Sequence, residues 1–327
     1  MALLEVRDLT VSFDTPDGVV HAVNGINFDL DPGETLGLVG ESGSGKTQTA
    51  LALIGLLAEN GRASGSVKFR GQELLGMSIS ELSRVRGSKI SMIFQDPISS
   101  LNPYMTIGDQ LVEVLTYHRN LRRRAARERA IEMLNQVHLS DPKQRMRQYP
   151  HELSGGMCQR VMIAMGLLCQ PDLLIADEPT TALDVTVQSQ INTLMAELSE
   201  QSSTAILLIT HDLGVVAGLC HRVLVMYAGQ EMEMAEVKEL FADPRHPYTE
   251  GLLNSVPRLD KARSGILNAI PGNPPNLLDI PSGCPFSNRC RYAFEKCREL
   301  PEFEQLDGGR LKRCHLDALP VTEEEAG

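Results

Sequence analysis

The strongest constraint on the fold is the stretch G-E-S-G-S-G-K-T at residues 40–47. It follows the apolar run T-L-G-L-V, and continuous apolar runs are typical of strands buried on both faces of a parallel sheet. The residues from Lys46 to about Leu57 have the pattern of a helix. A buried strand that enters a helix through a glycine-rich loop predicts an α/β fold with a mostly parallel sheet.

The glycine-rich loop also predicts a chemistry. Glycines let the loop curl so that backbone N–H groups face a phosphate, and the positive end of the following helix points at the same charge. In such a loop a lysine reaches the β- and γ-phosphates of a nucleotide and a hydroxyl ligates Mg²⁺. The candidate residues for ATP are Gly40, Ser42, Gly43, Gly45, Lys46 and Thr47, with Thr47 also a ligand of Mg²⁺.

A second buried strand, L-L-I-A-D-E, ends in two carboxylates. Asp177 suits a contact to Mg²⁺, and Glu178 is placed to polarise an attacking water. An apolar run that ends in Asp-Glu is weak evidence when it stands alone. Together with the glycine-rich loop it favours hydrolysis of a nucleoside triphosphate.

Composition excludes several classes of protein. The net charge of −11 argues against a sequence-independent nucleic-acid binder, which needs a basic face, so we expect no nucleic-acid partner. The N-terminus lacks the basic flank and apolar run of a signal peptide, and no stretch approaches the roughly 20 apolar residues that span a bilayer. We therefore expect a cytosolic or peripheral protein. The basic run at residues 119–129 is interpreted as a solvated helix face balanced by glutamates, with a surface near lipid headgroups as the alternative.

A third motif, L-S-G-G-M at residues 153–157, opens an apolar helix about twenty residues before the Asp-Glu strand. With these three motifs the chain resembles the ATP-binding subunits of ABC transporters. H-P-Y-T-E-G-L-L at 246–253 and the segment C-P-F-S-N-R-C extend the resemblance over essentially the whole length. The chain resembles the ATPases of dipeptide and oligopeptide permeases, and the D subunits of oligopeptide permeases in particular.

The resemblance implies a P-loop (RecA-like) ABC core of class α/β, an inserted α-helical subdomain, an N-terminal antiparallel β subdomain and a small Cys-rich extension. The implied ranges are 1–95 and 158–235 for the core, 96–157 for the helical subdomain with its signature motif, and 236–327 for the extension.

The resemblance also assigns roles to matching residues. Ser154, Gly155 and Gly156 would meet the γ-phosphate of ATP held by a partner subunit, because the start of their helix is again an anion site. The family usually has Gln where this chain has Met157, a departure that leaves the serine and both glycines intact.

Four further positions match the family one by one. Gln95, which follows the predicted short strand I-S-M-I-F at 90–94, would sense Mg²⁺ and water and contact the membrane partner, and His211 would hold the γ-phosphate. Asp184 would lie in a loop that crosses the dimer interface. Phe13 would stack on adenine, where Tyr is commoner in the family; a core position is the alternative for Phe13.

The seven cysteines fall into two groups. Cys158, Cys169 and Cys220 lie in apolar or helical context and are expected to be packed thiols, since disulfides are rare in a reducing compartment. The later four are spaced C-x5-C-x6-C-x16-C, wider than the usual pairs of structural zinc, and four thiolates can also hold an iron–sulfur cluster. The resemblance favours a [4Fe–4S] cluster, with Zn²⁺ as the alternative, on Cys284, Cys290, Cys297 and Cys314.

The resemblance thus implies the ATP-hydrolysing subunit of a bacterial importer of peptides, peripheral on the cytoplasmic face of the inner membrane. Its expected partners are a second ABC ATPase, favoured as a paralogue in a heterodimer, two transmembrane permease subunits and an extracytoplasmic solute-binding protein. Related ATPases serve importers of metal chelates and other solutes, so the solute stays open. Soluble ABC ATPases of DNA repair or translation and non-catalytic regulatory partners are the alternatives; the former carry coiled coils or two cassettes, and the latter lack residues that this chain keeps.

Overall fold

The computed structural model of the protein describes residues 2–180, 185–255 and 270–320. The chain forms two compact units. Unit 1 comprises Met1–Leu4, Asp29–Thr35 and Lys68–Ile209, and unit 2 comprises Glu5–Phe28, Leu36–Val67 and Thr210–Gly327.

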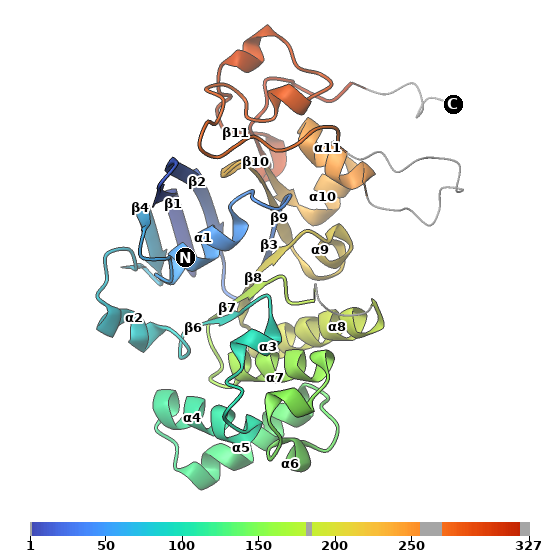
Figure 1. Cartoon of the computed structure of the whole chain (residues 1–327). Helices are drawn as coiled ribbons and strands as arrows, with labels where there is room; N and C mark the ends of the chain where they lie inside the picture. The colour runs from blue at the N-terminus through green and yellow to red at the C-terminus, as the bar shows by residue number, and fades with distance from the viewer. Residues whose placement is uncertain (1, 181–184, 256–269, 321–327) are drawn as a thin grey trace. The chain divides into compact units, whose positions relative to one another are not determined.

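Unit 1 contains three parallel strands in the order β8-β7-β6, together with most of the helices (Figure 1). Strands β8 and β7 are fully buried, and β6 is partly buried. Residues of β6 pair in register with residues of β7, from Ile90 opposite Leu173 to Ile93 opposite Ala176. The elements are β5 (Gln72–Glu73), α2 (Ile79–Val85), β6 (Ile90–Ile93), α3 (Pro97–Ser100), α4 (Ile107–Arg119), α5 (Arg123–Gln136), α6 (Pro142–Arg145), η1 (Pro150–Glu152), α7 (Gly155–Leu167), β7 (Leu173–Asp177), α8 (Val185–Ser202) and β8 (Ala205–Thr210). The strands predicted from the apolar runs before Gln95 and Glu178 are therefore confirmed.

Helix α4 illustrates how local sequence sets these elements. The Thr106 hydroxyl accepts a hydrogen bond from the Asp109 backbone N–H at 3.1 Å, which caps the first turn. Ile107, Leu111 and Leu115 recur at helical spacing and are buried. Helices α4 and α5 pack on α7, and Figure 1 shows these helices gathered with α6 at one end of unit 1.

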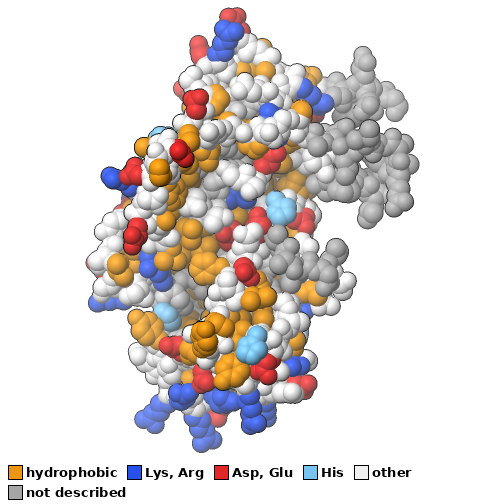
Figure 2. Space-filling view, viewed as in Figure 1, with side chains coloured by type: hydrophobic (Ala, Val, Ile, Leu, Met, Phe, Trp, Pro, Cys, Tyr) orange, Lys and Arg blue, Asp and Glu red, His pale blue; other side chains and the backbone are white. Residues whose placement is uncertain are grey.

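The basic run at residues 119–129 lies at the end of α4 and in α5, and most of its side chains are exposed. Figure 2 shows Lys and Arg side chains gathered over this helical end of unit 1. Arg124 pairs with Glu128 at 3.3 Å and Arg123 pairs with Asp109 at 2.6 Å. These ion pairs agree with the interpretation of a solvated helix face with balancing carboxylates.

Unit 2 contains the phosphate-loop strand β3, which pairs in parallel with β9, while β9 pairs antiparallel with β10. The strand order here is β11-β12-β10-β9-β3, and β2, β1 and β4 belong to a separate sheet in that order. The elements are β1 (Leu4–Thr15), β2 (Gly18–Leu30), β3 (Thr35–Val39), α1 (Lys46–Leu53), β4 (Gly61–Phe69), α9 (Leu213–Leu219), β9 (Arg222–Tyr227), β10 (Gln230–Glu236), α10 (Val237–Ala242), α11 (Pro247–Asn254), η2 (Ser287–Arg289), η3 (Glu295–Arg298), β11 (Glu304–Gln305), η4 (Asp307–Gly309) and β12 (Leu311–Lys312).

In unit 2 one helix is shorter than the sequence predicts, and one strand was not predicted. Helix α1 ends at Leu53 rather than near Leu57, because Gly55 adopts a φ of 63° that stops a helix. Strand β10 reads Q-E-M-E-M-A-E, and its carboxylates Glu231 and Glu233 are fully buried. Acidic residues predict an exposed segment, so the pairing of this strand with β9 and β12 was not foreseen.

The compact units cut the chain differently from the ranges expected for a core, a helical subdomain and an extension, and those ranges stay predictions. Over the described ranges, no helix has both the length and the apolar character that a bilayer span requires.

Candidate functional site

The glycine-rich loop has a backbone that few other residues could adopt. Gly45 has a φ of 99°, and a Cβ on it would overlap the carbonyl oxygen of Ala22. A Cβ on Gly40 would likewise overlap the carbonyl oxygen of Met226. The loop therefore lies close against neighbouring backbone, and only glycine fits at these two positions.

Lys46 follows the loop as the first residue of α1 and is buried. Its ammonium donates hydrogen bonds to the carbonyl oxygens of Gly40 at 2.8 Å and Glu41 at 2.9 Å. The ammonium is thus held inside the curl of its own loop, while Thr47 beside it is exposed. No side chain caps the start of α1, so its first N–H groups keep the arrangement that suits an anion.

In unit 1 the parallel register of β6 and β7 brings two predicted residues together. Gln95 lies two residues beyond the end of β6, and Glu178 directly follows β7. Gln95 Nε2 donates a hydrogen bond to the Glu178 carboxylate at 3.0 Å. Asp177, one residue earlier, is buried at the end of β7. The predicted catalytic carboxylate and the predicted sensor of Mg²⁺ are therefore hydrogen-bonded neighbours.

Glu178 also has an unusual backbone, with a φ of 46°. Its N–H donates to the carbonyl oxygen of Ile209 at 2.8 Å, which holds the residue in this conformation. A non-glycine residue in the left-handed region carries strain of about 1–2 kcal/mol, and such strain concentrates at functional sites. The turn lets the buried strand end at Asp177 and brings the Glu178 carboxylate within reach of Gln95.

His211 is exposed and follows β8 directly. The next residue, Asp212, caps α9, since its carboxylate accepts hydrogen bonds from the N–H groups of Gly214 at 2.8 Å and Val215 at 3.3 Å. The histidine therefore lies between the end of a buried strand and a capped helix, and its contact to the γ-phosphate stays a prediction.

Ser154 lies at the start of α7, where its hydroxyl accepts a hydrogen bond from the Met157 N–H at 3.4 Å. Ser154 and Gly155 are exposed, and Gly156 packs close to Val187. Because Met157 contributes its backbone N–H to this cap, its unusual side chain leaves the start of the helix intact.

Phe13 is half-buried and its ring lies against Gly61 of β4, where a side chain would collide with the ring. This packing suits a core position as well as an adenine-stacking role, which stays a prediction. Asp184 lies outside the described residues.

The four late cysteines line one small cavity of about 10 Å³, together with His246 and His315. All seven cysteines are free thiols, and Cys158 and Cys169 are buried as expected. Burial raises the pKa of Cys284 to about 12, with a further rise from the other three thiols of the cavity. In residues 2–180, 185–255 and 270–320, no group of three or more His, Cys, Asp or Glu side chains has a spacing that would hold a metal ion.

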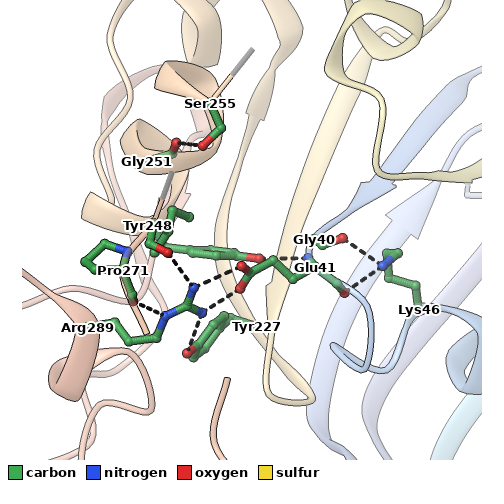
Figure 3. Close-up of polar contacts among 10 residues, drawn as sticks. Gly40, Glu41, Lys46, Tyr227, Tyr248, Gly251, Ser255, Pro271 and Arg289 are labelled. Atoms are coloured by element: carbon green, nitrogen blue, oxygen red, sulfur yellow. Dashed lines mark hydrogen bonds and ion pairs between the residues drawn. The ribbon is translucent and has the colours of Figure 1, made fainter. Parts of the chain in front are cut away.

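Sequence reasoning missed one set of residues that touches the glycine-rich loop. Arg289, from the Cys-rich segment, forms an ion pair with Glu41, the second residue of the loop, at 2.6 Å (Figure 3). This pair raises the pKa of the Arg289 guanidinium. The hydroxyl of Tyr248 accepts a hydrogen bond from the Glu41 N–H at 2.8 Å. H-P-Y at 246–248 marked the resemblance, but nothing in the sequence indicated that its tyrosine would contact the loop.

Two family models match the chain. The ABC transporter model covers residues 23–181, and the model of the oligopeptide/dipeptide transporter C-terminal region covers residues 232–297. The second match includes Cys284, Cys290 and Cys297.

Curated relatives match nearly the full length. The oligopeptide transport ATP-binding protein OppD of Escherichia coli (strain K12) is 59% identical over 96% of this chain and 93% of its own. The oligopeptide transport ATP-binding protein AppD of Bacillus subtilis (strain 168) is 49% identical over 96% of both chains.

Solved structures support the fold of the ATP-binding part. The ATP-binding cassette MJ0796, in a dimeric post-hydrolysis state bound to ADP and phosphate, aligns with a TM-score of 0.65 at 25% identity, over 72% of this chain and 98% of that chain. The protein cbiO1 from Clostridium perfringens, part of an ABC transporter complex, aligns with a TM-score of 0.63 at 30% identity, over 74% of this chain and 91% of that chain.

Proposed function

Because the chain belongs to the family of ATP-binding proteins of oligopeptide ABC transporters, we propose that it binds and hydrolyses ATP to power the import of peptides. The observation that carries this proposal is the glycine-rich loop, closed against its surroundings and holding the buried Lys46, in a chain that also carries the Gln95–Glu178 pair.

Each of these residues has its own role in the proposed hydrolysis of ATP. Loop N–H groups and the start of α1 bind the phosphates, and Lys46 exchanges its contacts to loop carbonyls for the β- and γ-phosphate oxygens. Glu178 accepts a proton from the attacking water, while Gln95 holds its carboxylate in position. His211 donates a hydrogen bond to the γ-phosphate.

Thr47, Gln95 and Asp177 supply the hydroxyl, amide and carboxylate oxygens that Mg²⁺ prefers, so the donor set fits this ion. When bound there, Mg²⁺ would supply positive charge that stabilises the phosphate oxygens.

We further propose that the ATP site is completed by a second ABC ATPase, which offers its own equivalents of Ser154, Gly155 and Gly156. The exposure of Ser154 and Gly155 at a helix start supports this, as does the dimeric state of the MJ0796 cassette. A paralogue is the favoured partner, and Asp184 would lie at the shared interface. Two transmembrane permease subunits and an extracytoplasmic solute-binding protein complete the complex, with this chain peripheral on the cytoplasmic face of the membrane.

For the Cys-rich segment we propose a [4Fe–4S] cluster on Cys284, Cys290, Cys297 and Cys314. The four thiols line one cavity, which fits four-thiolate ligation in number and type, although their spacing is not that of a closed site. Bound iron would deprotonate the thiols despite their burial and cross-link the segment. Iron, sulfide and zinc should be measured in anaerobically purified protein, with the Cys290→Ser variant for comparison. Iron and sulfide that fall in the variant support the cluster, whereas stoichiometric zinc in colourless protein contradicts it.

The function is tested with Glu178→Gln in the assembled complex. The variant should bind ATP as tightly as the wild type and lose roughly 100-fold or more in turnover, because it keeps the hydrogen bond to Gln95 and loses the proton acceptor. Normal turnover would remove Glu178 from its assigned role. Peptides should raise the ATPase rate when the solute-binding protein is present, and stimulation by a metal chelate alone would reassign the solute.

A further inference from the structure

Every N–H group of the Arg289 guanidinium donates a hydrogen bond to a group of the protein. Two of its nitrogens bind the Glu41 carboxylate, at 2.6 and 3.0 Å. Its remaining N–H groups donate to the Tyr227 hydroxyl at 3.1 Å and to the carbonyl oxygens of Pro271 at 2.9 Å and Ile270 at 3.3 Å. These contacts use all five donors that an arginine has, and only 5% of the Arg289 side chain is exposed.

The partners of Arg289 are themselves rigid. Tyr227 and Tyr248 are buried, and their rings pack against each other and against Phe286, with centroid distances of 4.7 to 5.3 Å. The His246 ring accepts a hydrogen bond from the Tyr248 N–H at 3.0 Å. The Tyr248 hydroxyl therefore comes from a packed aromatic cluster, which also lies beside the Arg289 guanidinium. Figure 3 shows the guanidinium and this hydroxyl meeting Glu41.

On the loop side, Glu41 is held at three points. Its carboxylate is bound by Arg289, its N–H donates to Tyr248, and its carbonyl oxygen accepts from Lys46. The last contact links the network to the lysine that reaches the phosphates. A loop fixed in this way loses little conformational entropy when a ligand binds.

Charge gives the network a second effect. Glu41 places a carboxylate next to a loop that must attract a polyanion, and 28% of its side chain is exposed. The bidentate guanidinium neutralises that carboxylate directly. Without Arg289, the unpaired carboxylate would repel the phosphates and compete for the Lys46 ammonium.

We propose that Arg289 and Tyr248 are positioning residues of the nucleotide site, so that the C-terminal extension shapes the phosphate loop directly. This inference rests on the proposal that residues 40–47 bind the phosphates of ATP. Arg289 acts through Glu41 and touches no reacting atom, so its removal should weaken ATP binding and raise KM while leaving kcat nearly unchanged.

The test measures the Kd of Mg-ATP by titration calorimetry and the KM and kcat of the assembled complex. Arg289→Ala should weaken ATP binding about tenfold, equal to about 1.4 kcal/mol. Adding Glu41→Gln to Arg289→Ala should restore most of the affinity, because the repelling charge is then gone. The matched control is Arg291→Ala, which removes an exposed arginine of the same segment that pairs with Glu250 at 2.6 Å. This control should bind ATP like the wild type.

The results distinguish a failure of the proposed function from a failure of the inference about Arg289. A wild-type protein that does not bind ATP contradicts the proposed function itself. A wild-type protein that binds, with an unchanged Kd for Arg289→Ala or with no recovery on adding Glu41→Gln, overturns the inference. If Arg289→Ala does not fold, Tyr248→Phe takes its place, since it removes only the hydroxyl that accepts from Glu41. A severalfold weaker Kd for that variant supports the inference, and a wild-type Kd overturns it.

Discussion

Gly45→Ala should disable the phosphate loop at a stability loss that can be worked out from the backbone. An alanine at a φ of 99° carries left-handed strain of about 1–2 kcal/mol. Its Cβ would also overlap the backbone carbonyl of Ala22, which is not free to swing away as a flexible side chain is. Overpacking of this kind costs about 1–3 kcal/mol, so we expect a total loss of about 3 kcal/mol.

The matched control is Gly25→Ala. Gly25 has a φ of 75°, but a Cβ there meets nothing within 4 Å, so the control carries the strain without the overlap. Thermal unfolding should show a fall in Tm for Gly45→Ala about two to three times that for Gly25→Ala, at about 2–4 °C per kcal/mol.

ATP binding should separate the two variants further. Gly45→Ala must displace its loop and should lose at least about tenfold in affinity, or about 1.4 kcal/mol, whereas Gly25→Ala should bind ATP normally. Equal Tm values and wild-type ATP affinity in both variants would refute the claim that the close approach of backbone to backbone requires glycine at position 45.

Two further predictions concern buried groups elsewhere. Arg313 pairs with the fully buried Glu231 at 3.2 Å, so Arg313→Ala leaves a buried carboxylate unpaired and should destabilise the protein by about 3–5 kcal/mol at pH 7. Urea unfolding measures this loss, and the control Arg62→Ala, which removes an exposed ion pair, should cost about 0–1 kcal/mol. Burial raises the pKa of Glu231, and the charge of Arg313 opposes this rise. In folded Arg313→Ala the Glu231 carboxyl therefore binds a proton at a pH at which the same carboxyl is ionised in the unfolded chain. Its deficit should therefore shrink as the pH falls towards the ordinary Glu value, and a deficit independent of pH would contradict this. Burial also raises the pKa of Cys158, which is 1% exposed. Its alkylation at pH 8, followed by peptide mass spectrometry, should therefore be on the order of 100-fold slower in the native than in the unfolded protein. Equal rates would show that the thiol is accessible.

Several parts of the site were predictable because their signals are local. The apolar runs before Gly40 and Glu178 each form a fully buried strand, and the run before Gln95 forms a partly buried one, with the candidate residue just beyond the end of each strand. Parallel strands end at one edge of a sheet, which explains why Gln95 and Glu178, distant in sequence, meet in a hydrogen bond. Strand β10 was missed because its buried glutamates contradict the usual apolar pattern. Their burial is tolerable because Arg313 pairs with Glu231, while Arg310 and two backbone N–H groups bind Glu233.

The sequence alone therefore determined the phosphate loop, the strand-end carboxylates and the helix that opens at Ser154, since each depends on a few consecutive residues. Tertiary structure decided that the four late cysteines share a cavity and that Arg289 reaches Glu41, 248 residues away along the chain. Contacts of that kind leave no local pattern, because they form only when packing brings distant segments together and removes the alternative partner, water.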